Sequence, residues 1–228
     1  MSNLSYKLFA LEGLDGCGKA TQARRLLSNL KKVAQPVYGV SFPDYNSRSS
    51  VLAKMYLNSE LAFPPQQENV YAVSSFFAVD RYVSCISNWK KYYDAGRTIV
   101  TDRYTTSNAV YQLSSLGREK WDSYLDWLLD YEYEKLGLPR PCMVIYLDMP
   151  VEKSQELVLK RYGGKKDKRD LYERDREKLY KCREAAMYVS KKFGWKVVEC
   201  VNRETGNIRS VDEISKVIFD LVCDVLKA

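Results

Sequence analysis

The segment from Gly13 to Lys19 reads GLDGCGK, which has the residue types and the spacing of a phosphate-binding loop. Its glycines allow backbone N–H groups to turn inward around phosphate oxygens, and the lysine adds a mobile positive charge. The helical segment that follows would direct the positive end of its dipole at the same anion. Because an apolar run precedes the loop and a helical pattern follows it, we interpret the segment as a nucleotide-phosphate site.

Ala20 stands where such a loop usually carries a Ser or Thr hydroxyl that binds Mg²⁺. Thr21 is adjacent, but successive helical residues point about 100° apart, so it is no simple replacement. Mg²⁺ keeps several waters and takes few protein ligands, so the loss of one hydroxyl does not exclude a metal site. The carboxylates that we expect to hold the metal instead are those of Asp15, Asp102 and Glu173.

Five apolar runs alternate with helical patterns along the chain. The runs predicted as strands cover residues 7–13, 37–43, 97–104, 141–150 and 194–201. Helical spacing covers 18–32, 47–93 with a break at two prolines, 106–113, 119–136, 151–162 and 210–227, the last opened by a Ser210 cap. This alternation predicts an α/β fold with a parallel sheet covered on both faces. Ligands bind at the carboxyl ends of such strands, where this sequence places Glu12, Asp44, Asp102, Arg103 and Asp148.

The composition excludes several kinds of chemistry. There is no histidine, which removes His-based catalytic triads, His general bases and His-liganded metals. The six cysteines are scattered without a CxxC pair, which favours reduced thiols over disulfides or a zinc site. No apolar run approaches the roughly 18 residues of a membrane span, and no signal peptide is apparent. The 228 residues therefore predict one domain over 1–228, in the cytoplasm and without a membrane partner.

The net charge of +7 is concentrated in one part of the chain. Residues 160–183 hold eleven Lys or Arg and five Asp or Glu, which gives +6 from this segment. A local basic excess favours a small phosphate-rich ligand over nucleic acid, which needs a longer basic track. The alternative is a solvated charged helix.

Seven segments together resemble the thymidylate kinase family of nucleoside monophosphate kinases, over nearly the whole chain. They are EGLDGCGKATQ (12–22), FPDY (42–45), FFAVDR (76–81), DRYTTSNAVYQ (102–112), LGLPRP (136–141), LDMP (147–150) and KRDLYERDREKLY (168–180). The fourth is the most specific, because it matches the monophosphate-site motif of this family. The resemblance implies a P-loop NTPase fold with five parallel strands and a short basic lid. It also implies Mg²⁺-dependent phosphoryl transfer from ATP to dTMP for dTTP synthesis, usually by a homodimer.

The same resemblance implies roles for individual residues. The ATP phosphates would lie on Gly13, Asp15, Gly16, Cys17, Gly18, Lys19, Ala20 and Thr21. The dTMP site would consist of Asp15, Phe42, Tyr45, Phe77, Arg81, Arg103, Ser107, Asn108, Tyr111 and Gln112. Phe77 would stack on thymine, Arg81 would donate to a carbonyl of the base and Asn108 would read its edge. Tyr111 would crowd the 2′ position. Arg103 would bridge the two substrates, with Asp102 orienting it or a metal-bound water.

Residues 161–172 resemble the mobile lid of this family. Members carry a catalytic cation either in the phosphate loop or in the lid, and the loop position here is Gly16. We therefore expect the cation in the lid, at Arg169 first and Arg174 second, beside acidic positions Asp170 and Glu173. With Lys19, Arg103 and Asp15, Arg169 completes the expected catalytic set. The alternative for this segment is the exposed start of a charged helix.

Asp44 is a second departure from the family, because an arginine beside this proline usually touches the acceptor phosphate. A carboxylate would repel that phosphate, so Arg48 is a candidate to reach back. Two alternatives to a dTMP kinase therefore stay open: a kinase for dUMP, UMP or CMP, and a nucleotide-binding protein without turnover. Among single residues, Phe77 could belong to the core, and Arg81 and Arg103 could form surface ion pairs.

Overall fold

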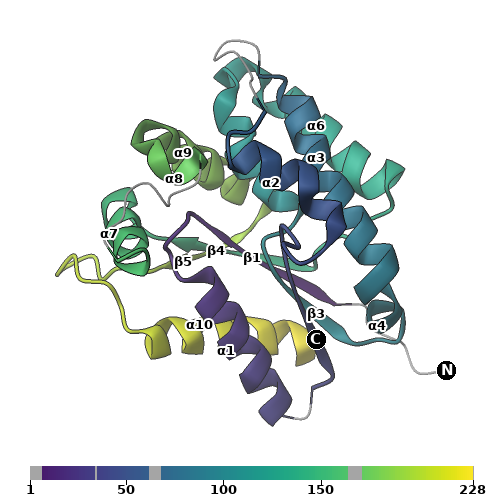
Figure 1. Cartoon of the computed structure of the whole chain (residues 1–228). Coiled ribbons are helices and arrows are strands. Elements are labelled where there is room, and N and C mark those ends of the chain that lie inside the picture. The colour runs from purple at the N-terminus through teal and green to yellow at the C-terminus, as the bar shows by residue number, and fades with distance from the viewer. Residues whose placement is uncertain (1–6, 34, 62–67, 164–170, 228) are drawn as a thin grey trace.

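A computed structural model of the chain describes residues 7–33, 35–61, 68–163 and 171–227 (Figure 1). Five strands form one parallel sheet in the order β2-β3-β1-β4-β5. They are β1 (Leu8–Gly13), β2 (Val37–Ser41), β3 (Thr98–Asp102), β4 (Met143–Asp148) and β5 (Lys196–Glu199). The predicted α/β fold with a five-stranded parallel sheet is confirmed, and each strand lies within its predicted run.

Helices cover both faces of the sheet (Figure 1). They are α1 (Lys19–Lys32), α2 (Val51–Leu57), α3 (Val70–Ser84), α4 (Lys90–Asp94), α5 (Asn108–Tyr111), α6 (Trp121–Leu129), α7 (Val151–Arg161), α8 (Leu171–Arg174), α9 (Arg176–Phe193) and α10 (Val211–Lys227). On one face, α1 and α10 pack against the strands through a cluster that includes Leu26, Leu30 and Ile218. The opposite face carries α3, α6 and α9. Burial on both faces explains why the central strands β1, β3 and β4 read as nearly continuous apolar runs.

The central position of β1 brings the phosphate loop to the middle of the sheet edge. Every residue of β1 is buried, and the strand pairs with β3 on one side and β4 on the other. Leu11 lies opposite Asp102, so the end of β1 adjoins the residue that precedes Arg103. The two segments with the strongest sequence motifs therefore meet at one edge.

Two segments differ from the sequence predictions. The helix expected over 106–113 is divided into a 3-10 turn (Thr105–Ser107), α5 and a second 3-10 turn (Leu113–Ser115). The long helix α9 was not predicted, because its charges were interpreted only as part of a basic segment. It begins after Asp175, whose carboxylate accepts a hydrogen bond from the Lys178 N–H at 2.9 Å. For residues 176–183 the alternative of a charged helix is therefore the observed one.

Smaller predictions are also confirmed. Ser210 and Glu213 form a reciprocal cap at α10, with the Ser210 hydroxyl accepting from the Glu213 N–H at 3.2 Å and the Ser210 N–H donating to the Glu213 carboxylate at 2.8 Å. All six cysteines are free thiols. Within the described ranges, none of the helices combines the length and the apolar character that a membrane crossing requires.

Candidate active site

The phosphate loop connects β1 to α1 and folds back on its own lysine. The Nζ of Lys19 donates to the carbonyl oxygen of Leu14 at 2.8 Å and lies 3.8 Å from the carboxylate of Asp15. Gly16 has a φ of +84° and packs against α7, where a Cβ would approach the Ser154 carbonyl oxygen to 2.3 Å. No side chain fits there, which accounts for the absence of a basic residue at this loop position.

A cavity of about 730 Å³ opens above the loop, a volume within the usual range for small-molecule sites. Seven of the eight residues predicted to bind ATP line it: Asp15, Gly16, Cys17, Gly18, Lys19, Ala20 and Thr21. Gly13 does not line it. A Cβ on Gly13 would meet the sulfur of Cys17 at 2.6 Å and the Leu147 carbonyl oxygen at 2.8 Å, so this glycine is required for close packing.

Other walls of this cavity were missed by sequence reasoning. Arg24 lies on α1, Ile208 and Arg209 lie on the connection between β5 and α10, and Arg161 ends α7. The Arg209 guanidinium donates to the Glu199 carbonyl oxygen at 3.1 Å, which fixes the connection to β5. Arg24, Ile208 and Arg209 belong to no motif, so only the fold shows that they face the phosphate loop, whereas Arg161 is the first residue of the predicted lid.

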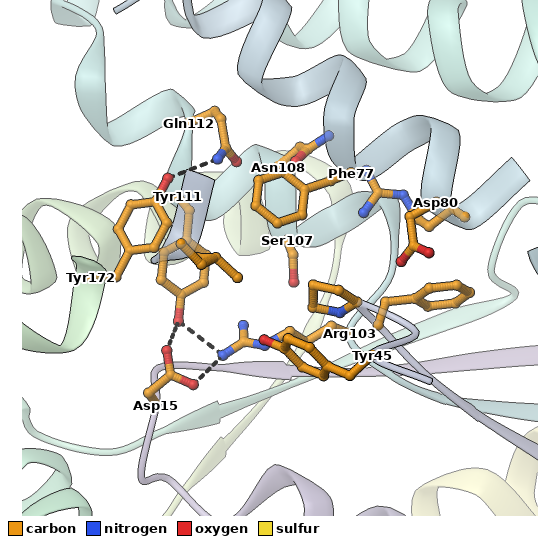
Figure 2. A pocket seen from close by; sticks show the side chains of 14 residues that line it. Asp15, Tyr45, Phe77, Asp80, Arg103, Ser107, Asn108, Tyr111, Gln112 and Tyr172 are labelled. Atoms are coloured by element: carbon orange, nitrogen blue, oxygen red, sulfur yellow. Dashed lines mark hydrogen bonds and ion pairs between the residues drawn. The ribbon is translucent and has the colours of Figure 1, made fainter. Parts of the chain in front are cut away.

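A second cavity lies between the sheet edge and the helices above it (Figure 2). All ten residues predicted for the acceptor line it: Asp15, Phe42, Tyr45, Phe77, Arg81, Arg103, Ser107, Asn108, Tyr111 and Gln112. Figure 2 shows Phe77, Asn108 and Gln112 on the helical side and Asp15, Arg103 and Tyr45 on the sheet side. Asp15, Phe42, Tyr45 and Arg103 line both cavities, so the two sites adjoin.

Arg103 is the central cation of this junction. Its guanidinium donates to the Asp15 carboxylate at 2.5 Å and to the Tyr111 hydroxyl at 3.2 Å, and that hydroxyl donates to the other Asp15 oxygen at 3.2 Å (Figure 2). Burial raises the pKa of Asp15, but the charges of Arg103 and Lys19 outweigh it and lower the pKa to about 2. The carboxylate is therefore ionised at neutral pH. Asp15, rather than Asp102, orients Arg103 in this structure.

The backbone of Arg103 is strained, with a φ of +66°, and a buried carboxylate holds the turn that follows it. Glu12, which is fully buried, accepts hydrogen bonds from the Tyr104 N–H at 3.0 Å and the Thr106 and Ser107 hydroxyls at 2.6 and 2.8 Å. Burial raises the pKa of Glu12, opposed by Arg103 and by these donors. The end of β1 thus anchors the turn that carries Arg103. In the sequence, the only sign of this anchoring role was the position of Glu12 at the end of a predicted strand.

Arg81 forms a buried ion pair in the wall of the acceptor cavity. It is 1% exposed, and its Nε and Nη2 donate to the two oxygens of Glu132 at 2.7 and 2.6 Å. The Nδ2 of Asn108 donates to Glu132 as well, at 2.9 Å. The alternative of a surface ion pair is wrong for Arg81, and Glu132 was missed because it lies in an acidic helical stretch without a motif.

Asp44 does not line the acceptor cavity, although Tyr45 beside it does. Its N–H donates to the buried carboxylate of Asp80 at 2.8 Å, and its own carboxylate accepts from Ser84 on α3 at 3.4 Å. Asp44 is therefore not in the wall from which the sequence suggested that it would repel a phosphate. Arg48 is exposed and does not line the cavity either.

The three carboxylates considered for Mg²⁺, those of Asp15, Asp102 and Glu173, all line the phosphate-loop cavity. Glu173 is buried and ion-paired to Arg161, and Asp15 is bound by Arg103. Within the described part of the chain, the carboxylate of Asp102 accepts no hydrogen bond, and no three His, Cys, Asp or Glu residues form a metal cluster. The donor set fits Mg²⁺, which takes one or two carboxylates together with phosphate oxygens and water.

Most of the predicted lid falls on residues 164–170, which lie outside the described residues. Arg169 and Asp170 are among them. The side chain of Arg174 is also outside them. The two ends of the segment belong to helices, because Arg161 ends α7 and Tyr172 lies in α8. Tyr172 is 5% exposed and lines the acceptor cavity, where its hydroxyl accepts from Gln112 at 2.8 Å.

Comparison with known proteins agrees with this geometry. A family model described as Thymidylate kinase matches residues 11–210. The chain is 32% identical to the thymidylate kinase of Mycobacterium tuberculosis over 178 residues, which cover 75% of this chain and 79% of that protein. It is 27% identical to the thymidylate kinase of Arabidopsis thaliana over 221 residues, which cover 96% and 72% of the two chains. A probable thymidylate kinase of Thermococcus onnurineus is 29% identical over 187 residues, covering 80% and 83%.

Proposed function

Because the chain belongs to the thymidylate kinase family, we propose that it transfers the γ-phosphoryl group of ATP to dTMP, giving ADP and dTDP for dTTP synthesis. The observation that carries this proposal is the pair of adjoining cavities. One contains a phosphate loop, the other a buried polar wall suited to a base, and Arg103 and Asp15 line both. A phosphoryl group can pass between two substrates only where their sites meet.

The reaction needs positioning and charge neutralisation more than covalent chemistry. A phosphate oxygen of dTMP attacks the γ-phosphorus in line, and the bond from that phosphorus to the β–γ bridging oxygen breaks. Lys19 and the loop N–H groups hold the ATP phosphates, while Arg103 neutralises the charge that gathers between the substrates. No general base is required, since the acceptor phosphate is already ionised at neutral pH. The absence of histidine is therefore no obstacle.

The acceptor cavity supports the roles expected for dTMP. Phe77 supplies a ring for stacking, while Arg81 and Asn108 supply polar groups for the base edge. Tyr111 is fixed by Asp15 and Arg103, so its ring stands rigidly beside the position expected for the sugar. Arg169 remains our candidate for the lid cation, with Arg174 second.

Mg²⁺ is the proposed cofactor, and it would neutralise charge on the ATP phosphates. We assign Asp102 as the carboxylate most available to it, with Asp15 and Glu173 within the same cavity. Ala20 supplies no ligand, so Asp102 takes over part of the task of the missing hydroxyl. What this chain contributes is a carboxylate at the end of β3, directly before the arginine that contacts both sites.

We also propose a homodimer that forms through α3. Exposed apolar side chains lie along one face of this helix and the turn after it: Tyr71, Val79, Tyr82 and Ile86, exposed by 36–56%. Their spacing of 8, 3 and 4 residues keeps them on one side of a helix. Analytical ultracentrifugation of Val79→Glu and of the wild type tests this. If the variant sediments with the same mass as the wild type, α3 is not the interface. The cytoplasm stays the proposed compartment, supported by six free cysteines.

An acceptor screen tests the proposed function. Purified protein is incubated with ATP, Mg²⁺ and one of dTMP, dUMP, UMP or CMP, and ADP release is coupled to NADH oxidation. We expect the highest kcat/KM with dTMP. Equal rates with all four acceptors would support a less selective pyrimidine kinase, and ATP binding without ADP release would support a nucleotide-binding protein without turnover.

A further inference from the structure

Glu132 is a buried charge that the proposed phosphoryl transfer does not use. It lies in a π-helical turn (Asp130–Lys135) after α6, and its side chain is 0% exposed. Its neighbours along the chain, Glu134 and Asp130, form exposed ion pairs with Arg140 and Lys135. Such π-helical turns occur frequently at functional sites. Removing a carboxylate from water costs free energy, which its buried partners must offset.

The partners of Glu132 fix the orientation of the Asn108 amide. The Nδ2 of Asn108 donates to Glu132 at 2.9 Å and to the Ser74 carbonyl oxygen at 3.1 Å. An ionised carboxylate and a carbonyl accept hydrogen bonds and cannot donate, so only the nitrogen of the amide can face them. Both amide hydrogens are then used, and the Oδ1 of Asn108 is left as an acceptor. Asn108 lines the acceptor cavity, and no described residue donates to that Oδ1.

Glu132 also fixes the second polar group of this wall. Arg81 directs its Nε and one N–H of Nη2 at the carboxylate, which leaves the remaining guanidinium N–H groups as donors. Burial lowers the pKa of Arg81, but Glu132 outweighs this effect and keeps it raised, so the group stays charged. One carboxylate therefore sets an acceptor on Asn108 beside a donor on Arg81.

We propose that Glu132 is the positioning residue that selects the class of base, by holding Asn108 as an acceptor and Arg81 as a donor. This pattern pairs with a pyrimidine that has a 4-keto oxygen and an N3–H, namely thymine or uracil. Cytosine presents an N3 acceptor and a 4-amino donor. Its N3 would therefore face the acceptor of Asn108, and its amino group would face the donor of Arg81. The inference rests on the proposed acceptor site and goes beyond it, because it assigns the orientation of both base-facing groups to a carboxylate that does not itself line the cavity.

The size of the discrimination follows from the burial of this wall. Arg81, Asn108 and Glu132 are each at most 1% exposed, so a mismatched base leaves them without water as a substitute partner. Sites built from buried hydrogen-bonding groups reject analogues that leave these groups unpaired by about 10⁴-fold or more. We expect dUMP and dTMP to bind at least about 100-fold more tightly than dCMP, because water at the cavity mouth reduces the effect.

Glu132→Gln tests the proposal, with Glu134→Gln on the same turn as the matched control. The introduced amide can donate to Asn108, which then can rotate and turn its nitrogen to the cavity. We expect the preference for dTMP over dCMP in kcat/KM to fall at least about tenfold, with the KM for ATP nearly unchanged. The control should keep the wild-type preference, since Glu134 pairs with Arg140 at the surface. An equal fall in kcat/KM for dTMP and for dCMP would indicate a merely structural role for Glu132 and overturn the proposal.

Two further measurements guard against a folding defect. Glu132→Asp keeps the charge opposite Arg81 and withdraws it by one methylene, so it should weaken dTMP binding while the midpoint of thermal unfolding stays close to wild type. The wild-type protein itself provides the other test, by calorimetric binding of dTMP, dUMP and dCMP without ATP. If dCMP binds as tightly as dUMP, the proposal fails. A protein that binds keto bases selectively but releases no ADP would refute the kinase function and leave the role of Glu132 supported.

Discussion

Replacing Thr106 by Val tests whether Glu12 anchors the turn that carries Arg103. The Thr106 hydroxyl donates to the buried Glu12 carboxylate at 2.6 Å and does not line the acceptor cavity. Valine keeps the shape of the side chain and removes the donor. A hydrogen bond to a charged group contributes about 1.5–3 kcal/mol, so we expect the free energy of unfolding to fall by about 2 kcal/mol at a pH where Glu12 is ionised.

The pH dependence of this loss follows from the pKa of Glu12, which burial raises and the Thr106 hydroxyl lowers. Without the hydroxyl that pKa rises further, so ionised Glu12 costs the variant more stability than the wild type. When Glu12 is protonated in both proteins, the extra cost disappears. The difference in stability should therefore be smallest at acidic pH, where Glu12 is protonated in both proteins, and should grow as the pH rises through the pKa of Glu12.

Urea denaturation of wild type and variant at several pH values between about 5 and 9 measures this effect. Thr101→Val is the matched control, because the buried Thr101 hydroxyl donates to a neutral carbonyl, that of Phe9, at 3.4 Å. Its loss should cost about 1 kcal/mol or less and should not depend on pH. A Thr106→Val loss that is independent of pH, or no larger than the control, would refute Glu12 as a charged anchor. We also expect kcat/KM for dTMP to fall more than that for ATP in Thr106→Val.

Three further substitutions test other parts of the site. Lys19→Ala should lower kcat at least about 100-fold in the coupled ADP assay while circular dichroism stays that of the wild type, since the lysine neutralises phosphate charge; a variant with full rate would exclude that role. Tyr111→Phe should keep the preference for dTMP over ribothymidine monophosphate that Tyr111→Ala loses, if the ring acts sterically; equal loss in both would assign the preference to the hydroxyl. Gly16→Ala should lower the midpoint of thermal unfolding more than Gly18→Ala, because a Cβ at Gly16 meets a backbone oxygen at 2.3 Å and none lies within 4 Å of Gly18; similar midpoints would contradict close packing of the loop on α7.

The sequence by itself determined the parts of this protein that depend on local geometry. The phosphate loop requires glycines and a lysine within a few consecutive residues, and alternating strands and helices require periodic apolar residues. The acceptor residues from Arg103 to Gln112 lie in one short motif. All ten residues predicted for the acceptor line one cavity. Eight of them follow strands that end at the same edge of the sheet, and Phe77 and Arg81 lie on α3.

Only the tertiary structure decided which charges meet. Glu132 pairs with Arg81 across 51 positions of the chain, and Glu12 holds Thr106 across 94. No periodicity distinguishes these carboxylates from the exposed Glu134, since the free energy of a charge depends on its burial and partners. Asp44 shows the same limit, because its sequence position suggested repulsion and the fold turns its carboxylate toward Ser84. Local spacing fixes backbone shape, whereas the role of a charge is set by residues that only folding brings within hydrogen-bonding distance.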